Sequence, residues 1–318
     1  MHIPARIATS LGLLGTALAA QIPLVDPSLE TTSPGTPLPA YVLAHAPLSY
    51  LHSNEAWWPS DVARHLRHVE PKRKHQSVAP SVTCANISSL DRHIFLSSKD
   101  DPFASPQAAW IGGEGPPDEE GRAEGPATIV AYASVTIGDH IGDWEHSMVR
   151  FVNGTPEALY LSQHRSGIAY DFAAVPAVVG RPLTYIALGT HATFASPGKH
   201  QHDFPGLLDL TDEGFLWDVT KNYRGYWYDL QEKAFVAAGG TTSAEEDEMT
   251  RDVRWLDFQG RWGDKEYEWF KKGQYCVRIP RVASACKLVD GPTGPTGKNL
   301  ARTTVCQNEA HCVIRDSI

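Results

Sequence analysis

Short apolar runs with β-branched and aromatic residues, separated by turn residues, dominate the middle of the chain. His146–Val152 and Ala158–Ser162 flank the dipeptide Asn153-Gly154. Two such runs around Asn-Gly are typical of a β-hairpin. Further strands are predicted over Ala127–Thr136, Ile168–Ala173 and Leu183–Leu188. The pattern predicts a mainly β fold, an antiparallel β-sandwich with short helices and long loops.

Signals for helices are fewer than signals for strands. Pro59 followed by Ser60-Asp61 offers an N-cap, so we expect a short helix over Val62–Val69. Residues 241–252 are acidic and are a second candidate helix start. The stretches predicted to be loops or irregular are 70–80, which is basic, 99–126, which is rich in Asp, Glu, Gly and Pro, and 199–233, which is aromatic.

The first 19 residues resemble a secretory signal peptide. Arg6 precedes the apolar run Ile7–Leu18, and Ala17-Leu18-Ala19 fits an A-x-A cleavage site. No later stretch has the roughly 18 apolar residues of a transmembrane helix. We expect a protein that is secreted or carried through the secretory pathway to a vacuole. The predicted division is a signal peptide over 1–19, an extended lead-in over 20–40, one β-sandwich domain over 41–280 and a disulfide-stapled tail over 281–318.

The cysteines fit that compartment. In an oxidising lumen the four C-terminal cysteines are expected to form two disulfides, by one of three pairings. These are Cys276, Cys286, Cys306 and Cys312. Cys84 lies far upstream and either keeps its thiol or displaces one of them. A zinc site is the alternative, but spacings of 9, 19 and 5 intervening residues match no zinc ribbon or finger. Asn86-Ile-Ser and Asn153-Gly-Thr are acceptors for N-glycosylation and predict a glycoprotein.

Composition narrows the class of partner. The 318 residues have 28 Lys and Arg against 37 Asp and Glu, a net charge of −9. Without a basic stretch to match a phosphate backbone, this balance argues against nucleic acid as the main partner. The hydrophobic fraction of 42% is ordinary for a globular protein. Neither number fixes the oligomeric state.

Chemistry concentrates in the stretch Gly138–Arg150. If the chain is a strand from Asp143 onward, Asp143 and Glu145 point to one face, while Trp144 and His146 point to the other. A bend at Gly142 would let His140 fold back toward the carboxylates. His140, Asp143 and Glu145 could then hold a divalent cation; calcium or magnesium suits the carboxylates, and the imidazole leaves manganese or zinc open. The alternative is a strand whose polar face is simply hydrated.

Two further histidines each come shortly after a predicted strand. His164 comes after one predicted strand and His191 after another, in Gly189-Thr-His-Ala. Together with His146 they are candidate catalytic groups, acting as general acid or base at one rim of the sandwich. The alternatives are a turn residue at His164 and a strand-closing hydrogen bond at His191. A Ser-His-Asp triad has no supporting Gly-x-Ser-x-Gly elbow.

At these residues the chain resembles the vacuolar protein sorting-associated protein 62 family. The central signatures are Gly142-Asp-Trp-Glu-His146, Tyr160-Leu-Ser-Gln-His164 and Gly189-Thr-His-Ala192. Flanking segments that continue the likeness are Ala46–Ser53, Pro59–Asp61, Leu208–Gly214 and Phe258–Asp264. The resemblance covers roughly residues 41–270. It implies a shared fold and a vacuolar-sorting connection rather than a particular reaction.

A shorter likeness is to the necrosis-inducing toxins of plant pathogens. Their Gly-His-Arg-His-Asp-Trp-Glu motif lies on a β-sandwich and partly coordinates a divalent cation used at a glycolipid headgroup. This chain matches as His140-x-x-Asp143-Trp144-Glu145, with Gly142 in place of the second histidine. The upstream Asp ligand of the toxins falls on Tyr132, or is replaced by Asp139. The likeness therefore implies a cation and a small-molecule or glycolipid headgroup as ligand.

Three hypotheses for function follow. The first is a divalent-metal site at His140, Asp143 and Glu145 that binds an anionic or sugar headgroup, with His164 and His191 on the same rim. The second is a metal-assisted enzyme acting on a small molecule in a biosynthetic pathway, with His146, His164 or His191 as acid or base. The third is a sorting or scaffold protein without a catalytic site. An enclosed pocket at the rim would favour the enzyme, and an open face the headgroup.

Overall fold

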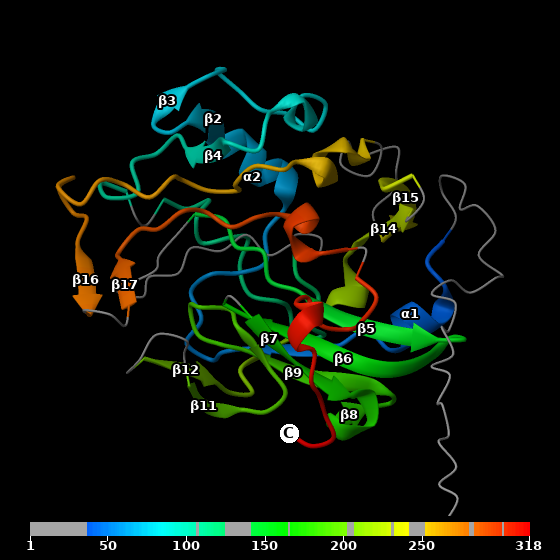
Figure 1. Cartoon of the computed structure of the whole chain (residues 1–318). Helices are drawn as coiled ribbons and strands as arrows, with labels where there is room; N and C mark the ends of the chain where they lie inside the picture. Colours follow the sequence, from blue (N-terminus) through cyan, green and yellow to red (C-terminus); the bar gives the residue numbers. More distant parts are fainter. Residues whose placement is uncertain are drawn as a thin grey trace, which may run out of the picture. The chain divides into compact units, whose positions relative to one another are not determined.

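The computed structural model describes residues 37–105, 108–124, 141–164, 166–201, 207–229, 232–241, 252–279, 283–300 and 302–318 (Figure 1). This part of the chain is mainly β, as the sequence predicts. Its α-helices are short: α1 (Ala40–Ala44) and α2 (Val62–His68). Single 3-10 turns are η1 (Ile87–Ser89), η2 (Phe172–Ala174), η3 (Val219–Lys221), η4 (Val253–Asp257), η5 (Pro295–Lys298) and η6 (Glu309–His311).

One sheet joins segments that are far apart in the sequence. Its strand order is β10-β9-β1-β13, and β8 pairs with β9. β1 pairs in parallel with β9, Leu48 lying opposite Leu183, and antiparallel with β13, Ser49 lying opposite Trp217. The sheet is therefore mixed. The bounds are β1 (Leu48–Leu51), β8 (Ala177–Val178), β9 (Arg181–Ile186), β10 (Thr193–Phe194) and β13 (Phe215–Asp218).

A second sheet has the order β18-β7-β6-β5 and contains the predicted hairpin. Its strands are β5 (Ser147–Val152), β6 (Thr155–Gln163), β7 (Ser166–Asp171) and β18 (Ile314–Arg315). Asn153 and Gly154 both have positive φ, +50° and +75°, which is the conformation that a two-residue hairpin turn requires. The Asn-Gly prediction is confirmed.

Both faces of β6 are buried, and this builds the sandwich. Leu159 and Leu161 pack against Ala195, which follows β10 of the first sheet. Tyr160 points the other way and packs against Val305 and Cys306 of the C-terminal segment. That segment, red in Figure 1, runs beside the sheet until β18 pairs with β7. The sandwich-like architecture is confirmed, with parallel pairs added at β1–β9 and β18–β7.

The largest core cluster of the described residues packs against α2, β2 and β4 and is rich in tryptophan. Trp255, Phe258 and Trp262 pack there with Ile94 and Leu96 of β4. The smaller sheets comprise β2 (Val69–Arg73), β3 (Gln76–Ser77), β4 (Ile94–Ser98), β11 (Gly198–Gln201), β12 (Leu208–Thr211), β14 (Arg224–Asp229), β15 (Ala234–Gly240), β16 (Cys276–Ile279) and β17 (Ala283–Cys286).

The predicted helix after Asp61 is confirmed. The Asp61 side chain accepts a hydrogen bond from the Arg64 backbone N–H at 2.9 Å and so caps α2. The strand that was expected from Asp143 onward begins only at Ser147. Residues 141 and 142 form a bend and residues 143–146 have no regular secondary structure, so the alternation of side chains expected for a strand does not apply there.

Two stretches expected to be irregular are in fact strands. Residues 70–80 contain β2 and β3, because Val69 and Pro71 bury one face of β2 while its charged residues stay toward solvent. Residues 199–233 contain most of β11 and all of β12, β13 and β14; buried Trp217 anchors β13 beside β1. In the described part of 99–126 the loop prediction holds. That loop is not fully exposed. Trp110 is buried and its Nε1 donates to Asp100 at 2.7 Å, so the loop is held against the core.

Several predictions fall outside the described residues. They are the signal peptide at 1–19, residues 20–36 of the lead-in, the strand at Ala127–Thr136, most of the acidic stretch 241–252, and His140. The predicted domain boundaries stay predictions. Within the described ranges no helix is both long and apolar enough to cross a bilayer.

The disulfide prediction is confirmed, and the structure selects one of the three pairings. Cys276 is bonded to Cys286 across β16 and β17, and Cys306 to Cys312 in the C-terminal segment. Cys84 is buried and lies outside both disulfides. The zinc alternative for these four cysteines is therefore not needed.

The Cys306–Cys312 disulfide should stabilise the C-terminal segment against β6 and β7. Replacing both cysteines by serine is expected to lower the free energy of unfolding by about 2 kcal/mol, since the bond closes a short loop in the unfolded chain. Urea denaturation measures the change. Dithiothreitol should have less effect on the double variant than on the unmodified protein. An unchanged urea midpoint would show that packing of Val305 alone holds the segment.

Candidate functional site

A buried ion cluster joins two of the central sequence signatures to Glu55, which lies after β1. His191 lies between two carboxylates: its Nδ1 is 2.9 Å from Asp143 Oδ2, and its Nε2 is 3.5 Å from Glu55 Oε2. The His191 and Glu55 side chains are 0% exposed and that of Asp143 is 6% exposed. We call Glu55, His191 and Asp143 the buried ion cluster. It fixes the 142–146 segment to the ends of β1 and β9.

The backbone brings these groups together. His191 has φ of +51° and follows Gly189 with φ of +70°, so the chain after β9 turns back sharply and aims the imidazole inward. The Glu55 carboxylate is itself held, because it accepts hydrogen bonds from the backbone N–H groups of Gly189, Ala56 and Trp57. Glu55 is thus a fixed partner for His191.

The cluster stays charged near neutral pH. Burial opposes the charged form of His191, but the hydrogen bond to Asp143 and the interaction with Glu55 outweigh it and raise the pKa of His191 to about 10. Burial likewise works to raise the pKa of Glu55, yet His191 brings it below its usual value. His191 therefore remains an imidazolium and positions two carboxylates, rather than changing protonation state at pH 7.

Glu145 lies next to this cluster and differs from it. The Ser162 hydroxyl donates a short hydrogen bond to Glu145 Oε2, and the His146 backbone N–H donates to Ser162 Oγ at 2.9 Å. Burial and the negative charge of Asp143 raise the pKa of Glu145 to about 7. Its second oxygen, Oε1, has no hydrogen-bond donor among the residues that the structure describes. Glu145 thus offers one anchored oxygen and one available oxygen.

His146 occupies a different environment. Its ring lies 5.5 Å from that of Tyr160, and in the described structure neither ring nitrogen has a hydrogen-bond partner. Burial, followed by the positive charges of Lys298 and Arg302, lowers the pKa of His146 to about 3. His146 is therefore neutral near pH 7. It faces the C-terminal segment rather than the buried ion cluster.

His164 ends β6 in a left-handed backbone conformation, with φ of +46°. Its Nε2 lies 2.8 Å from Asp209 Oδ2, and the Thr190 hydroxyl donates to Asp209 Oδ1 at 2.7 Å. Asp209 therefore connects the end of β6 to the loop that carries His191. This contact places the second and third signatures side by side.

The structure brings Asp143, Glu145 and His191 together, and it links His164 to the same loop through Asp209. Trp144 packs into the tryptophan core against Trp255 and Trp262. His140 lies outside the described residues, so the predicted ligand trio cannot be assembled there. Within the described part, no three His, Cys, Asp or Glu side chains are arranged to hold a metal ion. The metal and catalytic roles stay predictions.

Sequence reasoning missed Glu55, and it gave Asp209 no role. Glu55 lies two residues after the Ala46–Ser53 signature, and Asp209 lies inside the Leu208–Gly214 signature. An acidic residue inside or near a signature was the available signal. Ser162 lies inside the Tyr160–His164 signature but was given no role, whereas in the structure its hydroxyl donates to Glu145.

The sequence of this chain matches a known protein family. The family model for vacuolar protein sorting-associated protein 62 matches residues 120–276. Vacuolar protein sorting-associated protein 62 of Saccharomyces cerevisiae is 31% identical over 335 aligned residues, covering 85% of this chain and 68% of the relative. TDA6 of the same yeast, also named as a vacuolar protein sorting-associated protein, is 30% identical over 354 residues, covering 89% and 71%. No solved structure matches. The chain belongs to the vacuolar protein sorting-associated protein 62 family.

Proposed function

We propose that this chain is a vacuolar-sorting protein of the secretory pathway that binds an anionic or sugar headgroup through a divalent cation at Asp143 and Glu145. The names of both yeast relatives support the sorting role. Two disulfides support an oxidising compartment, because such bonds are rare where thiols are kept reduced.

The available oxygen of Glu145 carries the cation-binding part. Ser162 fixes the Glu145 carboxylate through Oε2, while Oε1 has no donor among the described residues, and Asp143 is close enough to raise the pKa of Glu145. Two neighbouring carboxylates repel each other, and a divalent cation relieves that repulsion. Calcium and magnesium prefer such oxygen ligands.

The donor set fits a cation that keeps open positions for a ligand. Asp143 and Glu145 supply oxygens, and His140 is the third ligand predicted from the sequence. His191 is committed to Asp143 and Glu55, so it orients the Asp143 carboxylate instead of binding the ion. When bound, the cation would supply positive charge for a phosphate, a carboxylate or the hydroxyls of a sugar.

The enzyme hypothesis is the alternative to headgroup binding. Two cavities of about 470 and 240 Å³ are lined by other residues of the described chain, and neither includes Glu145, His146 or His191. An enclosed pocket beside these groups would favour the enzyme. The scaffold hypothesis explains the buried ion cluster but leaves the available oxygen of Glu145 without a role.

Glu145→Gln tests the proposal without disturbing the buried ion cluster. The purified protein should bind about one equivalent of calcium or manganese, and Glu145→Gln should weaken binding at least about tenfold, since it removes one charged ligand. Calorimetric titration with each ion, together with elemental analysis, measures this. Glu213→Gln, an exposed carboxylate elsewhere, is the matched control and should bind as the unmodified protein does. No binding of calcium, magnesium, manganese or zinc to the unmodified protein would rule the proposal out.

A further inference from the structure

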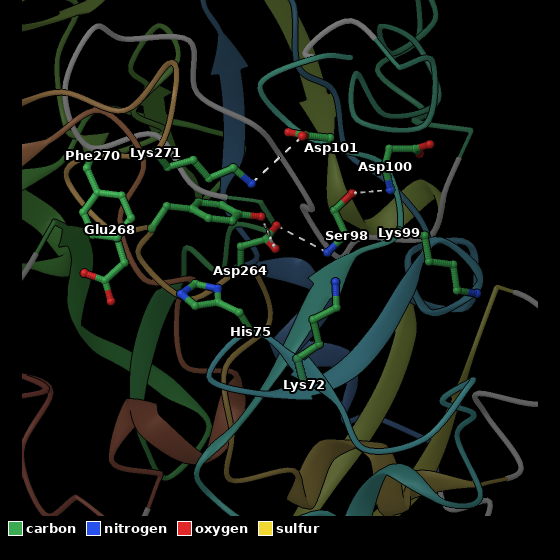
Figure 2. Close-up of a pocket in the computed structure, with 11 residues that line it drawn as sticks. Lys72, His75, Ser98, Lys99, Asp100, Asp101, Asp264, Glu268, Phe270 and Lys271 are labelled. Atoms are coloured by element: carbon green, nitrogen blue, oxygen red, sulfur yellow. Dashed lines mark hydrogen bonds and ion pairs between the residues drawn. The ribbon is translucent and has the colours of Figure 1, made fainter.

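A cavity of about 470 Å³ opens between the β2–β3 hairpin, the end of β4 and the segment from Asp264 to Lys271 (Figure 2). Its volume is in the range of sites that bind small molecules. Asp264 lies at its centre in Figure 2, with Phe270 and Glu268 on one side and Lys72 and Lys99 on the other. We call it the Asp264 cavity.

Asp264 is a fixed acceptor in this cavity. The residue is 6% exposed; Tyr267 Oη donates to its Oδ1 at 3.0 Å, and the Ser98 backbone N–H donates to its Oδ2 at 3.3 Å. The Tyr267 ring is held in turn by stacking on His75, with the ring centroids 5.2 Å apart. The carboxylate is therefore positioned before any ligand arrives.

The lining carries charges of both signs. Lys72 points into the cavity from β2, and Lys99, Glu268 and Asp264 also line it. The Lys99 ammonium points away from Asp264 and donates to the Arg67 backbone oxygen at 2.7 Å. The Glu268 side chain is exposed, and its carboxylate has no hydrogen bond or ion pair with the residues that the structure describes, although its backbone oxygen accepts from the Lys271 N–H at 2.9 Å. A lysine ammonium only donates hydrogen bonds and a carboxylate only accepts them. A simple anion would meet the carboxylates and a simple cation the lysines, whereas hydroxyl groups can donate to one and accept from the other.

An exposed aromatic ring lies at the edge of the cavity. Phe270 is 71% exposed and lines it, while its neighbour Trp269 is equally exposed at 71% but does not. Large aromatic side chains gain from burial, so two exposed ones in sequence indicate a surface that becomes covered. The C–H face of a sugar ring is apolar and flat enough to cover Phe270.

We propose that the Asp264 cavity binds a neutral oligosaccharide, with one sugar ring on Phe270 and its hydroxyls hydrogen-bonded to Asp264, Glu268 and Lys72. The hydroxyls donate to the two carboxylates and accept from the ammonium. This site is separate from the cation site proposed at Glu145, because it shares no lining residue with it. The two proposals can therefore fail independently.

To test this, neutral tetrasaccharides of glucose, mannose and N-acetylglucosamine are titrated into the full chain, and calorimetry measures their binding. At least one should bind with a dissociation constant below about 1 mM. Phe270→Ala should weaken that binding about tenfold, through loss of the apolar contact. Glu268→Gln should weaken it about fivefold, through loss of a charged acceptor. Trp269→Ala is the matched control and should stay within about twofold, because the ring is equally exposed but outside the cavity.

Two results would overturn the proposal. One is the absence of binding by all three tetrasaccharides at about 10 mM. The other is binding of the chain to phosphatidylcholine vesicles that Trp269→Ala and Phe270→Ala weaken equally, without sugar binding, since that pattern describes a membrane-interface anchor. The substituted residues are exposed, so circular dichroism should show the same fold in each variant.

Discussion

Replacing His191 by asparagine is expected to lower the free energy of unfolding by about 3–5 kcal/mol, because Asp143 and Glu55 then remain buried without a cation between them. Asparagine is chosen because it tolerates positive φ, and His191 has φ of +51°. The substitution thus removes the charge with little added backbone strain. Urea denaturation followed by tryptophan fluorescence measures the loss.

The matched control is His200→Asn. The His200 ring stacks on Phe194 with centroids 3.8 Å apart, and its Nε2 lies 3.1 Å from the backbone oxygen of Ser196, so no ion pair is involved. His200→Asn is expected to lower the free energy of unfolding by about 1 kcal/mol. Adding Glu55→Gln to His191→Asn should recover part of the loss, since one buried charge disappears. Equal losses at His191 and His200, with no recovery, would show that packing and not charge balance holds this cluster.

Local sequence rules predicted the elements that depend on neighbours in the chain. The Asn153-Gly154 turn follows from positive φ at adjacent residues, and the start of α2 follows from one side-chain hydrogen bond at Asp61. Both features are decided within a few residues. They were therefore predictable without knowledge of the fold.

Long-range pairing was not predictable in the same way. β1 has four residues and lies between β9 and β13, which are more than 130 residues away in sequence. Nothing within Leu48–Leu51 specifies a parallel partner. The basic residues at 72–74 likewise suggested a loop, because the hydrophobic partner of β2 is β4, reached only after a long connection. The charged residues on the more exposed face of β2 therefore obscured a strand whose other face is buried.

The sequence singled out Asp143, Glu145 and His191, which lie together in the structure, but it missed Glu55 and could not predict the protonation states of these groups. Asp143 and Glu145 lie near each other, yet each has a different hydrogen-bond partner from a distant segment. Asp143 is paired with His191, and Glu145 accepts from Ser162. Burial, followed by the positive charges of Lys298 and Arg302 from a distant part of the chain, lowers the pKa of His146. Such environments arise only when the chain has folded. For this reason His146, His164 and His191 look alike in the sequence but have different environments in the structure.

Gly142→Ala is expected to destabilise the fold by about 3 kcal/mol or more. Gly142 has φ of +71°, which costs an alanine about 1–2 kcal/mol. A Cβ at this position would also lie 2.2 Å from the backbone oxygen of Trp262, and overpacking of this kind costs about 1–3 kcal/mol more. Because Trp262 is fully buried in the tryptophan core, its backbone has little room to move. Urea denaturation measures the change.

Gly239→Ala separates the two contributions. Gly239 has a similar φ of +83°, but an added Cβ would meet nothing within 4 Å, so only the conformational cost of about 1–2 kcal/mol should appear. The difference between the losses of unfolding free energy in Gly142→Ala and Gly239→Ala then measures how tightly the 142–146 segment packs against the core. Near-ultraviolet circular dichroism should change in Gly142→Ala alone, because the backbone leads directly into Trp144 and its contact with Trp262. Equal losses in the two variants would mean that the segment can shift away from Trp262, in which case Asp143 and Glu145 are not held in the fixed position that cation binding requires.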